Sequence, residues 1–179
     1  MSAPTPLRLR YYGDPALTRG PAREVEQMKS DPEVQARLRT IVREMFALMY
    51  REKGMGLAAP QVGLDIALFI MATDVTNKDT ERVFVNPTIL NQSHEEETEP
   101  ERCLSFPGLT VRVSRPKLVR GAWLDLDGNA QRDLLEGLPA RCFQHEMDHL
   151  SGFLFTDRAI PAERDYVKRQ LKKLARRGL

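Results

Sequence analysis

This chain of 179 residues is poor in cysteine and histidine, with two of the first and three of the second. Two cysteines are too few for a disulfide scaffold, so apolar packing has to hold the fold. No apolar run approaches the length of a membrane span, and no secretory signal is visible. Hydrophobic residues make up 41% and charged residues 29%, as in an ordinary globular protein. We therefore predict one domain over residues 1–179.

The chain also has little net charge, because its 27 Lys and Arg nearly balance its 25 Asp and Glu and leave a net charge of +2. The C-terminal stretch is the exception: from Arg158 to Leu179, eight basic and two acidic residues leave +6. Residues 161–179 predict a helix. Its charge indicates either a solvated helix face or a surface that binds phosphate groups.

The rarity of histidine gives weight to one pentad, His145-Glu146-Met147-Asp148-His149, which has the pattern H-E-x-x-H. On a helix, side chains four residues apart share a face and are separated by about 6 Å along the axis. Two imidazoles can then bind one divalent ion while Glu146 stands beside it to accept a proton. A chance pair of helical histidines is the alternative. We favour a hydrolytic metal site.

The ends of the helix that carries the pentad can also be predicted. Pro139 suits a first turn, where its missing N–H costs nothing, and Gly152 is placed to end the helix. A catalytic metal site usually has three protein ligands and one open position. One ligand must therefore come from another part of the chain. The candidates are His94, Cys103, Cys142 and a carboxylate.

Cys103 is the most attractive of these candidates, because turn-forming residues flank it and could hold a thiolate at a fixed angle. Cys142 shares the helix face of His145, but helical side chains lean towards the N-terminus, away from the expected ion. His94 stands in a polar run typical of a solvated loop. A metzincin protease would have a third histidine at position 155, where this chain has Phe155.

The remaining pattern predicts an α+β fold. Asp31-Pro32 begins an N-terminal helix with an apolar stripe, and Gly54 ends it. Strands are predicted at 66–72, 83–90, 111–113 and 118–126, with Pro87 interrupting the second and a hairpin turn at 127–129. The acidic run 95–97 predicts a solvated loop. Antiparallel or mixed sheets would then surround the metal-binding helix, with one further helix near each end.

Three separated blocks resemble the motifs of the peptide deformylase family, in the family's order. Residues 54–61 (GMGLAAPQ) match G-x-G-L-A-A-x-Q, residues 101–105 (ERCLS) match E-G-C-L-S, and residues 144–149 (QHEMDH) match Q-H-E-x-D-H. The continuation to Gly108 is closer to the bacterial and plastid type than to mitochondrial forms. Together the blocks span most of the chain, so the resemblance is specific.

The resemblance implies a role for each matched position. Glu146 would be the general acid and base, and Gln61 and the backbone N–H of Leu104 would form an oxyanion hole. The family removes the N-formyl group from the initiator methionine of nascent peptides and releases formate. Its usual metal is Fe(II), which zinc, nickel or cobalt can often replace. The metal ligands, besides a water, would be Cys103, His145 and His149.

The resemblance also implies a narrow apolar pocket for the methionine side chain. Gly56 would let the substrate approach the backbone closely, and Arg141, at a position often apolar in the family, would make the pocket mouth more polar. Arg102 replaces the usual glycine, so we expect an ordinary backbone conformation and a guanidinium at the groove rim. Asp148 would orient the site, with Arg115 as its buried partner or else at the surface. The substrate-binding residues would be Met55, Gly56, Arg102, Leu138, Arg141 and Cys142.

The favoured function is therefore metal-dependent removal of the formyl group from formylmethionyl nascent peptides, by a monomer in the cytoplasm or, after loss of a targeting segment, in a plastid stroma. Some deformylases dock on the ribosome through a C-terminal helix, which the basic stretch 161–179 would allow. One alternative is a general H-E-x-x-H metallopeptidase with a ligand downstream of the pentad. Another is an RNA-binding module with a closed, structural metal site. The block 54–61 opposes both, since neither needs it.

Overall fold

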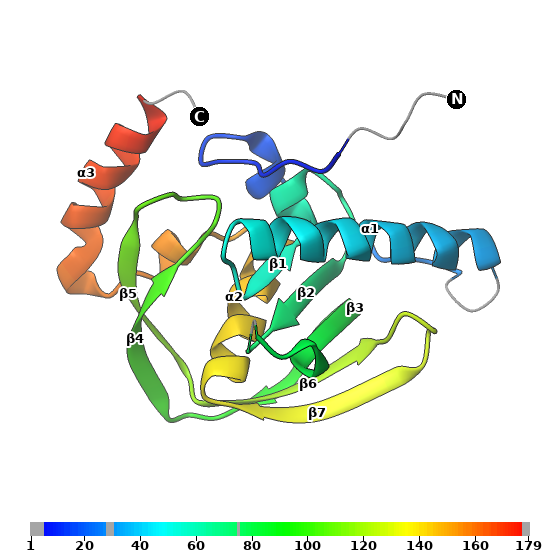
Figure 1. Cartoon of the computed structure of the whole chain (residues 1–179). Helices are drawn as coiled ribbons and strands as arrows, with labels where there is room; N and C mark the ends of the chain where they lie inside the picture. The colour runs from blue at the N-terminus through cyan, green and yellow to red at the C-terminus, as the bar shows by residue number, and fades with distance from the viewer. Residues whose placement is uncertain (1–5, 28–30, 75, 177–179) are drawn as a thin grey trace.

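The computed structural model describes residues 6–27, 31–74 and 76–176 (Figure 1). The helices are α1 (Pro32–Arg51), α2 (Leu138–Leu150) and α3 (Arg164–Ala175). The strands are β1 (Gly56–Ala58), β2 (Leu68–Ala72), β3 (Glu81–Gln92), β4 (Glu96–Arg102), β5 (Thr110–Pro116), β6 (Leu118–Leu124) and β7 (Ala130–Glu136). Short 3-10 helices are η1 (Pro15–Leu17), η2 (Ala59–Val62), η3 (Lys78–Thr80), η4 (Phe155–Arg158) and η5 (Pro161–Glu163). The order of elements is that of the predicted α+β fold.

Helix α1 begins where the sequence predicts. Asp31 is its N-cap and accepts hydrogen bonds from two backbone N–H groups of the first turn, and Pro32 takes the first helical position. The helix ends at Arg51, and Lys53 adopts a left-handed conformation with φ of 59° that turns the chain towards β1. Its buried side chains are Leu38, Val42, Met45, Phe46, Leu48 and Met49.

Five antiparallel strands form the main sheet, in the order β1-β2-β3-β6-β7. The interruption predicted at Pro87 is present: the register of β3 against β6 shifts between Val85 and Thr88, and Asn86 has a positive φ of 49°. Proline is tolerated at a bulge because it has no backbone N–H to donate to the neighbouring strand. The predicted hairpin turn joins β6 to β7.

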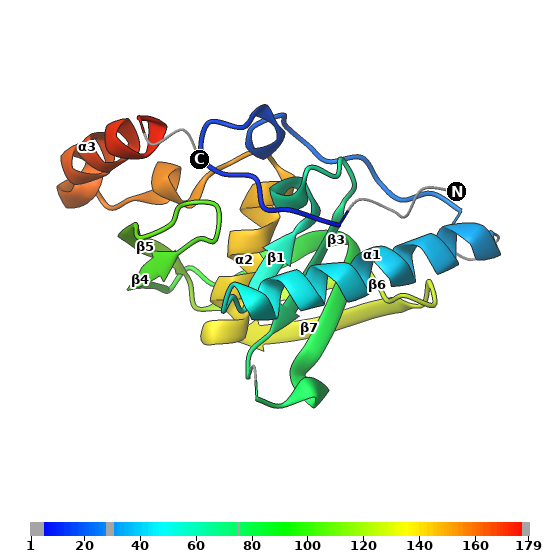
Figure 2. The ribbon, with the colours of Figure 1, turned by 45° about the horizontal axis from the view of Figure 1, so that its top comes forward.

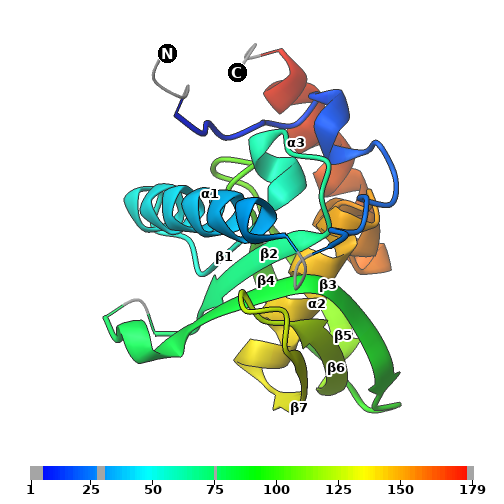
Figure 3. The same ribbon diagram turned by 90° about the vertical axis from the view of Figure 1, so that its right-hand side faces the viewer.

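Helices α1 and α2 pack on opposite faces of this sheet (Figure 3). Strand β2 is buried throughout, and its alternate side chains point into two hydrophobic cores, one on each face of the sheet. Leu68 and Ile70 pack with α1, whereas Phe69 packs with α2, where its ring meets Phe143 edge to face at 5.2 Å between centroids. Burial of each such side chain contributes roughly 2 kcal/mol. The sheet therefore fixes the position of α2.

Strands β4 and β5 form a separate antiparallel pair beside α2 (Figures 1 and 2). Strand β4 pairs along its whole length, and Cys103 follows its last residue directly. Helix α3 packs behind β5 through Val167 and Leu174, and Glu163 bonds the backbone N–H of Arg112 at 2.7 Å. None of the described helices offers the apolar length that crossing a bilayer would need.

Some predicted elements need correction. The run 95–97 is not a loop, because β4 begins at Glu96; its side chains are exposed as expected, but the backbone pairs with β5. The patterns did not predict β1, which has three residues, or β7, whose side chains are mostly exposed. Helix α3 begins at Arg164 after a 3-10 turn rather than at Pro161, and the predicted end at 177–179 lies outside the described residues.

Candidate metal centre and substrate groove

Helix α2 carries the pentad, of which every residue except Met147 is buried. Gly137, with φ of 61°, precedes the helix, and Gly152, with φ of 77°, follows it as predicted. His145 and His149 lie one turn apart, and their ring centroids are separated by 5.1 Å. Both imidazoles are buried, and burial lowers the pKa of His149 well below its usual value. At His149 this favours the neutral imidazole, the form that binds a metal ion.

Cys103 completes the group. Its Sγ lies 3.2 Å from His149 Nε2, and one donor atom each from Cys103, His145 and His149 lie within 4.8 Å of one another. Donor atoms around one tetrahedral ion stand roughly 3.5 Å apart, because each lies about 2.0–2.3 Å from the metal. The residues therefore fit a single divalent ion. A thiolate with two imidazoles suits zinc or a softer transition metal better than magnesium or calcium. We call this group the metal centre.

The other candidates for the third ligand lie away from the metal centre. His94 is exposed between β3 and β4. Cys142 is buried, with its Sγ 3.9 Å from the carbonyl oxygen of Met55. Burial raises the pKa of the Cys142 thiol well above its usual value, so it remains protonated. The two cysteines are free thiols. Cys142 is therefore the helix-wall residue that the sequence predicts.

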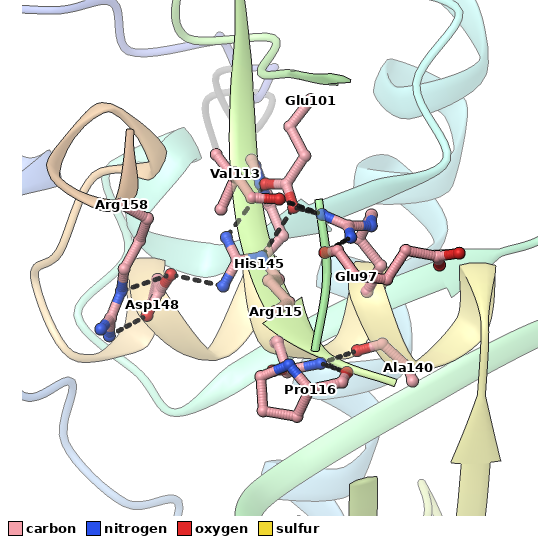
Figure 4. A network of polar contacts seen from close by, with 11 residues as sticks. Glu97, Glu101, Val113, Arg115, Pro116, Ala140, His145, Asp148 and Arg158 are labelled. Carbon is pink, nitrogen blue, oxygen red and sulfur yellow. Dashed lines mark hydrogen bonds and ion pairs between the residues drawn. The ribbon is translucent and has the colours of Figure 1, made fainter. Parts of the chain in front are cut away.

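Behind the metal centre, Glu101 of β4 holds His145 in place (Figure 4). Its Oε2 lies 3.0 Å from His145 Nδ1, which leaves the other ring nitrogen for the ion. Arg115 donates two hydrogen bonds to the same carboxylate, at 2.7 and 3.0 Å. Burial raises the pKa of Glu101, but the hydrogen bonds from His145 and Arg115 outweigh it and lower the pKa to about 2. Glu101 therefore stays ionised.

The same arginine reaches the pentad directly. Arg115 is buried and donates to Asp148 Oδ2 at 2.8 Å, which confirms the pairing that the sequence suggests. Arg158 of η4 donates to Asp148 Oδ1, also at 2.8 Å (Figure 4). Sequence reasoning missed Arg158 and the role of Glu101. Glu101 could have been found, since it opens the second motif and had no role there.

A groove of about 780 Å³ opens on the metal centre. Its floor includes His145, Cys103 and Glu146, so the ion would face open space on one side. That arrangement suits a catalytic site and opposes the closed site of the RNA-binding alternative. The lining also includes every predicted substrate-binding residue: Met55, Gly56, Arg102, Leu138, Arg141 and Cys142.

Glu146 lies in the groove with only 3% of its surface exposed. Burial raises its pKa to about 7. Its Oε2 is buried and has no hydrogen-bond partner among the described residues. A carboxylate in this state can accept and release a proton near neutral pH.

The amide of Gln61 is oriented by the backbone. Its Oε1 accepts a hydrogen bond from the N–H of Ala58 at 2.8 Å, so the NH₂ group faces the metal centre. There Nε2 lies 3.4 Å from Cys103 Sγ and 3.2 Å from Ser105 Oγ. Leu104, beside Cys103, also lines the groove. The structure therefore places the Gln61 amide beside the metal centre, and Leu104 next to the ligand Cys103 in the groove lining.

Gly56 is needed for a reason that the sequence did not indicate. A Cβ there would clash with Glu146 Oε1 and stand 2.9 Å from Cys142 Sγ. The glycine therefore makes room for the helix and its carboxylate, whereas the sequence interpretation gave that room to the substrate. Met55 and Leu138 are 38% and 47% exposed, so they form open apolar walls of the groove.

The two arginines of the groove behave differently. Arg102 has an ordinary backbone conformation and an exposed side chain whose Nε donates to Thr110 Oγ1 at 3.2 Å, as expected for a rim residue. Arg141 turns its guanidinium inward, and the side chain is only 12% exposed. Its Nη1 lies 2.7 Å from Glu101 Oε1. The guanidinium is thus bonded to the protein, while Arg141 still lines the groove.

Comparison with known proteins agrees with this site. Residues 6–165 match the family model described as polypeptide deformylase. The peptide deformylase of Thermotoga neapolitana is 42% identical over 169 residues, 94% of this chain and 96% of its own. A peptide deformylase structure from Plasmodium falciparum has a TM-score of 0.87 at 36% identity, covering 94% of this chain and 95% of that one.

A plant structure, peptide deformylase 1B of Arabidopsis thaliana, has a TM-score of 0.86 at 35% identity and covers 96% of this chain and 90% of its own. The Plasmodium and plant structures thus share the fold over most of this chain. The third ligand, Cys103, precedes the pentad, which contradicts the metallopeptidase alternative. The chain belongs to the peptide deformylase family, and its activity is removal of the N-formyl group from nascent peptides.

Proposed function

We propose that Glu146, Gln61 and the backbone N–H of Leu104 carry out deformylation at the metal centre. The observation that supports this most directly is the buried, unpartnered carboxylate of Glu146, which lies in an open groove beside the metal centre. A bound divalent ion would supply Lewis acidity and lower the pKa of a coordinated water. The chain's own groups then have to move one proton and stabilise one developing negative charge.

Glu146 moves the proton. It accepts it from the attacking water and passes it to the departing amine of the methionine. A pKa of about 7 suits both halves of this transfer at neutral pH. Gln61 Nε2 and the Leu104 N–H donate to the formyl oxygen as it becomes negative. In the described part of the chain no other group accepts a hydrogen bond from the Leu104 N–H, so it is available.

The methionine side chain occupies the apolar part of the groove. Leu138, Met55 and Cys142 supply walls with few polar atoms, which suits an unbranched thioether side chain. Gly56 keeps this part of the groove open to Glu146. Arg102 and Arg141 bound the groove beyond the pocket, where the rest of the peptide would lie.

The role of Gln61 can be tested by Gln61→Leu. We expect kcat for formate release from formyl-Met-Ala-Ser to fall by about 10²–10³-fold, because one oxyanion donor is lost. Metal content should be unchanged. Gln92→Leu, at an exposed position of β3, is the matched control and should retain the full rate. Full activity of Gln61→Leu would refute the assignment.

We propose Fe(II) as the resident ion, with zinc, nickel and cobalt able to replace it. The support is the thiolate of Cys103, which favours softer transition metals over hard cations. Metal analysis after purification without oxygen should find iron, and exposure to air should reduce formate release while the nickel-loaded protein resists. Stoichiometric zinc with air-stable activity would contradict iron.

We propose that α3 docks the enzyme on ribosomal RNA. The helix packs through Val167 and Leu174, and its basic side chains face outward. Phosphate contacts of this kind weaken steeply as salt rises. The exposed basic residues are Arg164, Lys168, Arg169, Lys172, Lys173 and Arg176.

Removing α3 would expose the core, so side-chain changes test docking better. Replacement of Lys168, Arg169, Lys172 and Lys173 by Gln should reduce ribosome co-sedimentation at low salt while peptide turnover is kept. The matched control replaces a similar number of exposed arginines on α1, among them Arg37. Equal co-sedimentation of both variants would exclude docking through α3.

We also propose that residues 1–179 act as one monomeric domain in a reducing compartment, the cytoplasm or a plastid stroma. Two free cysteines, one of them in the metal centre, suit a reducing environment. Light scattering should give a mass near 20.4 kDa. A mass twice as large would exclude the monomer.

A further inference from the structure

Arg141 lies one helical turn before His145 and makes contacts that a groove-lining residue does not need. Its Nη1 donates to Glu101 Oε1 at 2.7 Å and to the carbonyl oxygen of Val113 at 3.0 Å. Its Nη2 donates to the carbonyl oxygen of Glu97 at 2.6 Å. One side chain of α2 therefore bonds both β4 and β5, whose acceptor residues are labelled in Figure 4.

These contacts matter because, within the part of the chain that the structure describes, β4 pairs with a strand on one side only, β5. Strand β4 ends at Arg102, and the next residue is the ligand Cys103. The other two ligands belong to α2. The position of the thiolate relative to the imidazoles thus depends on how β4 is held against α2.

The carboxylate of Glu101 gives a second link. Its Oε1 receives Arg115 Nε and Arg141 Nη1, both at 2.7 Å, while Oε2 faces His145 Nδ1 at 3.0 Å. Arg115 is shared with Asp148, but Arg141 bonds the backbone of β4 as well as the carboxylate. Outer groups that orient a histidine ligand commonly change metal affinity by about 10–100-fold when they are removed.

We propose that Arg141 is a positioning residue that joins β4 to α2 and so holds Cys103 and His145 at the spacing that the ion requires. The inference rests on the proposed function only in that the metal centre binds an ion; it gives Arg141 a role apart from contact with substrate. Lysine could replace the charge but not the contacts, because one ammonium cannot reach acceptors on two strands as a planar guanidinium does.

The test compares Arg141→Met, Arg141→Lys and the wild type after removal of the native metal and loading with Co(II). Thiolate-to-cobalt absorption reports the Cys103 bond, and its decay in excess chelator gives the rate of metal release. We expect release at least about tenfold faster for Arg141→Met and an intermediate rate for Arg141→Lys. Arg120→Met, at an exposed position of β6, should match the wild type.

The proposal would be overturned by release at the wild-type rate from Arg141→Met, or by equal acceleration in Arg120→Met. If the release rate were unchanged and KM were raised, Arg141 would be a groove wall only. If Arg141→Met does not fold, the rate of metal release from Arg141→Lys is the test: release faster than from the wild type supports the proposal, and release at the wild-type rate contradicts it. Metal release is measured without peptide, so failure of wild-type formate release would count against the proposed function and not against this inference.

Discussion

The back of α2, which faces β4 and β5, and its front, which faces the groove, differ in how their side chains are satisfied. At the back, Glu101 and Asp148 are buried and bonded by three arginines. At the front, Glu146 Oε2 is buried with no partner among the described residues. Leu138, also at the front, is 47% exposed.

The difference shows how one short helix can be both rigid and reactive. Satisfied ion pairs at the back fix the ligands, because a buried charge that loses its partner is costly. At the front, the carboxylate of Glu146 lacks a full set of hydrogen bonds, and burial raises its pKa to about 7, so it can exchange a proton near neutral pH. Changes on the two sides should therefore have different consequences, reaction rate at the front and stability or metal retention at the back.

Glu146→Gln should have the largest effect on rate. An amide keeps the shape but cannot accept the proton of the attacking water, so kcat for formate release should fall by about 10²–10⁴-fold. The metal content, measured by atomic absorption, should match the wild type because Glu146 is not a ligand. If Glu146→Gln retained more than a tenth of the wild-type kcat, Glu146 would not be the group that transfers the proton.

Glu101→Gln should have the largest effect on stability. It leaves Arg115 and Arg141 facing a neutral amide, and breaking a buried ion pair in this way typically costs about 3–5 kcal/mol. Urea unfolding measures the loss. Glu99→Gln, at an exposed position of the same strand, is the control and should change the free energy of unfolding by under about 0.5 kcal/mol. Similar values for both variants would mean that the back does not support the fold.

In the metal-free protein, ionisation of the buried Glu146 should lower the free energy of unfolding as pH rises. The pKa of Glu146 is about 7 when folded, above its ordinary value of 4.5. Below pH 4.5 the group is protonated in both states and has no effect; as pH rises to 7, ionisation favours the unfolded chain. The free energy of unfolding of metal-free Glu146→Gln should then exceed that of the metal-free wild type by up to about 3 kcal/mol at pH 8, and the two should be equal at pH 4.

Thermal unfolding at pH 4, 6 and 8 would follow this gain. Glu136→Gln, at an exposed position of β7, is the control and should show no such trend. A gain that is the same at every pH would point to better packing instead of relief of a buried charge.

The smallest effect is expected at the apolar wall of the groove. Leu138→Ser should raise KM for a formyl-methionine peptide about five- to tenfold, because roughly 1–1.5 kcal/mol of apolar contact with substrate is lost. Stability should change little. Leu90→Ser, at a position 50% exposed on β3 and away from the groove, is the matched control. Equal KM values for both variants would remove Leu138 from the pocket.

Much of the α2 region could be predicted from local pattern alone. The spacing of His145 and His149 and the glycine after the helix follow from the helical repeat. The same is true of α1, where a capping aspartate and a proline mark the start. Prediction was poorer where the pattern is weak: the acidic run 95–97 shows no hydrophobic alternation and predicted a loop, but β4 begins at Glu96 and pairs with β5 along its whole length.

The sequence by itself determined the reactive groups, since H-E-x-x-H is a local pattern and the motif around Cys103 singled out the thiolate. Only the tertiary structure decided which groups support them. Cys103 meets His149 across 46 residues of sequence, and Arg141 meets Glu101 across 40. Such contacts depend on how a strand pair packs against a helix, and neither periodicity nor propensity carries that information.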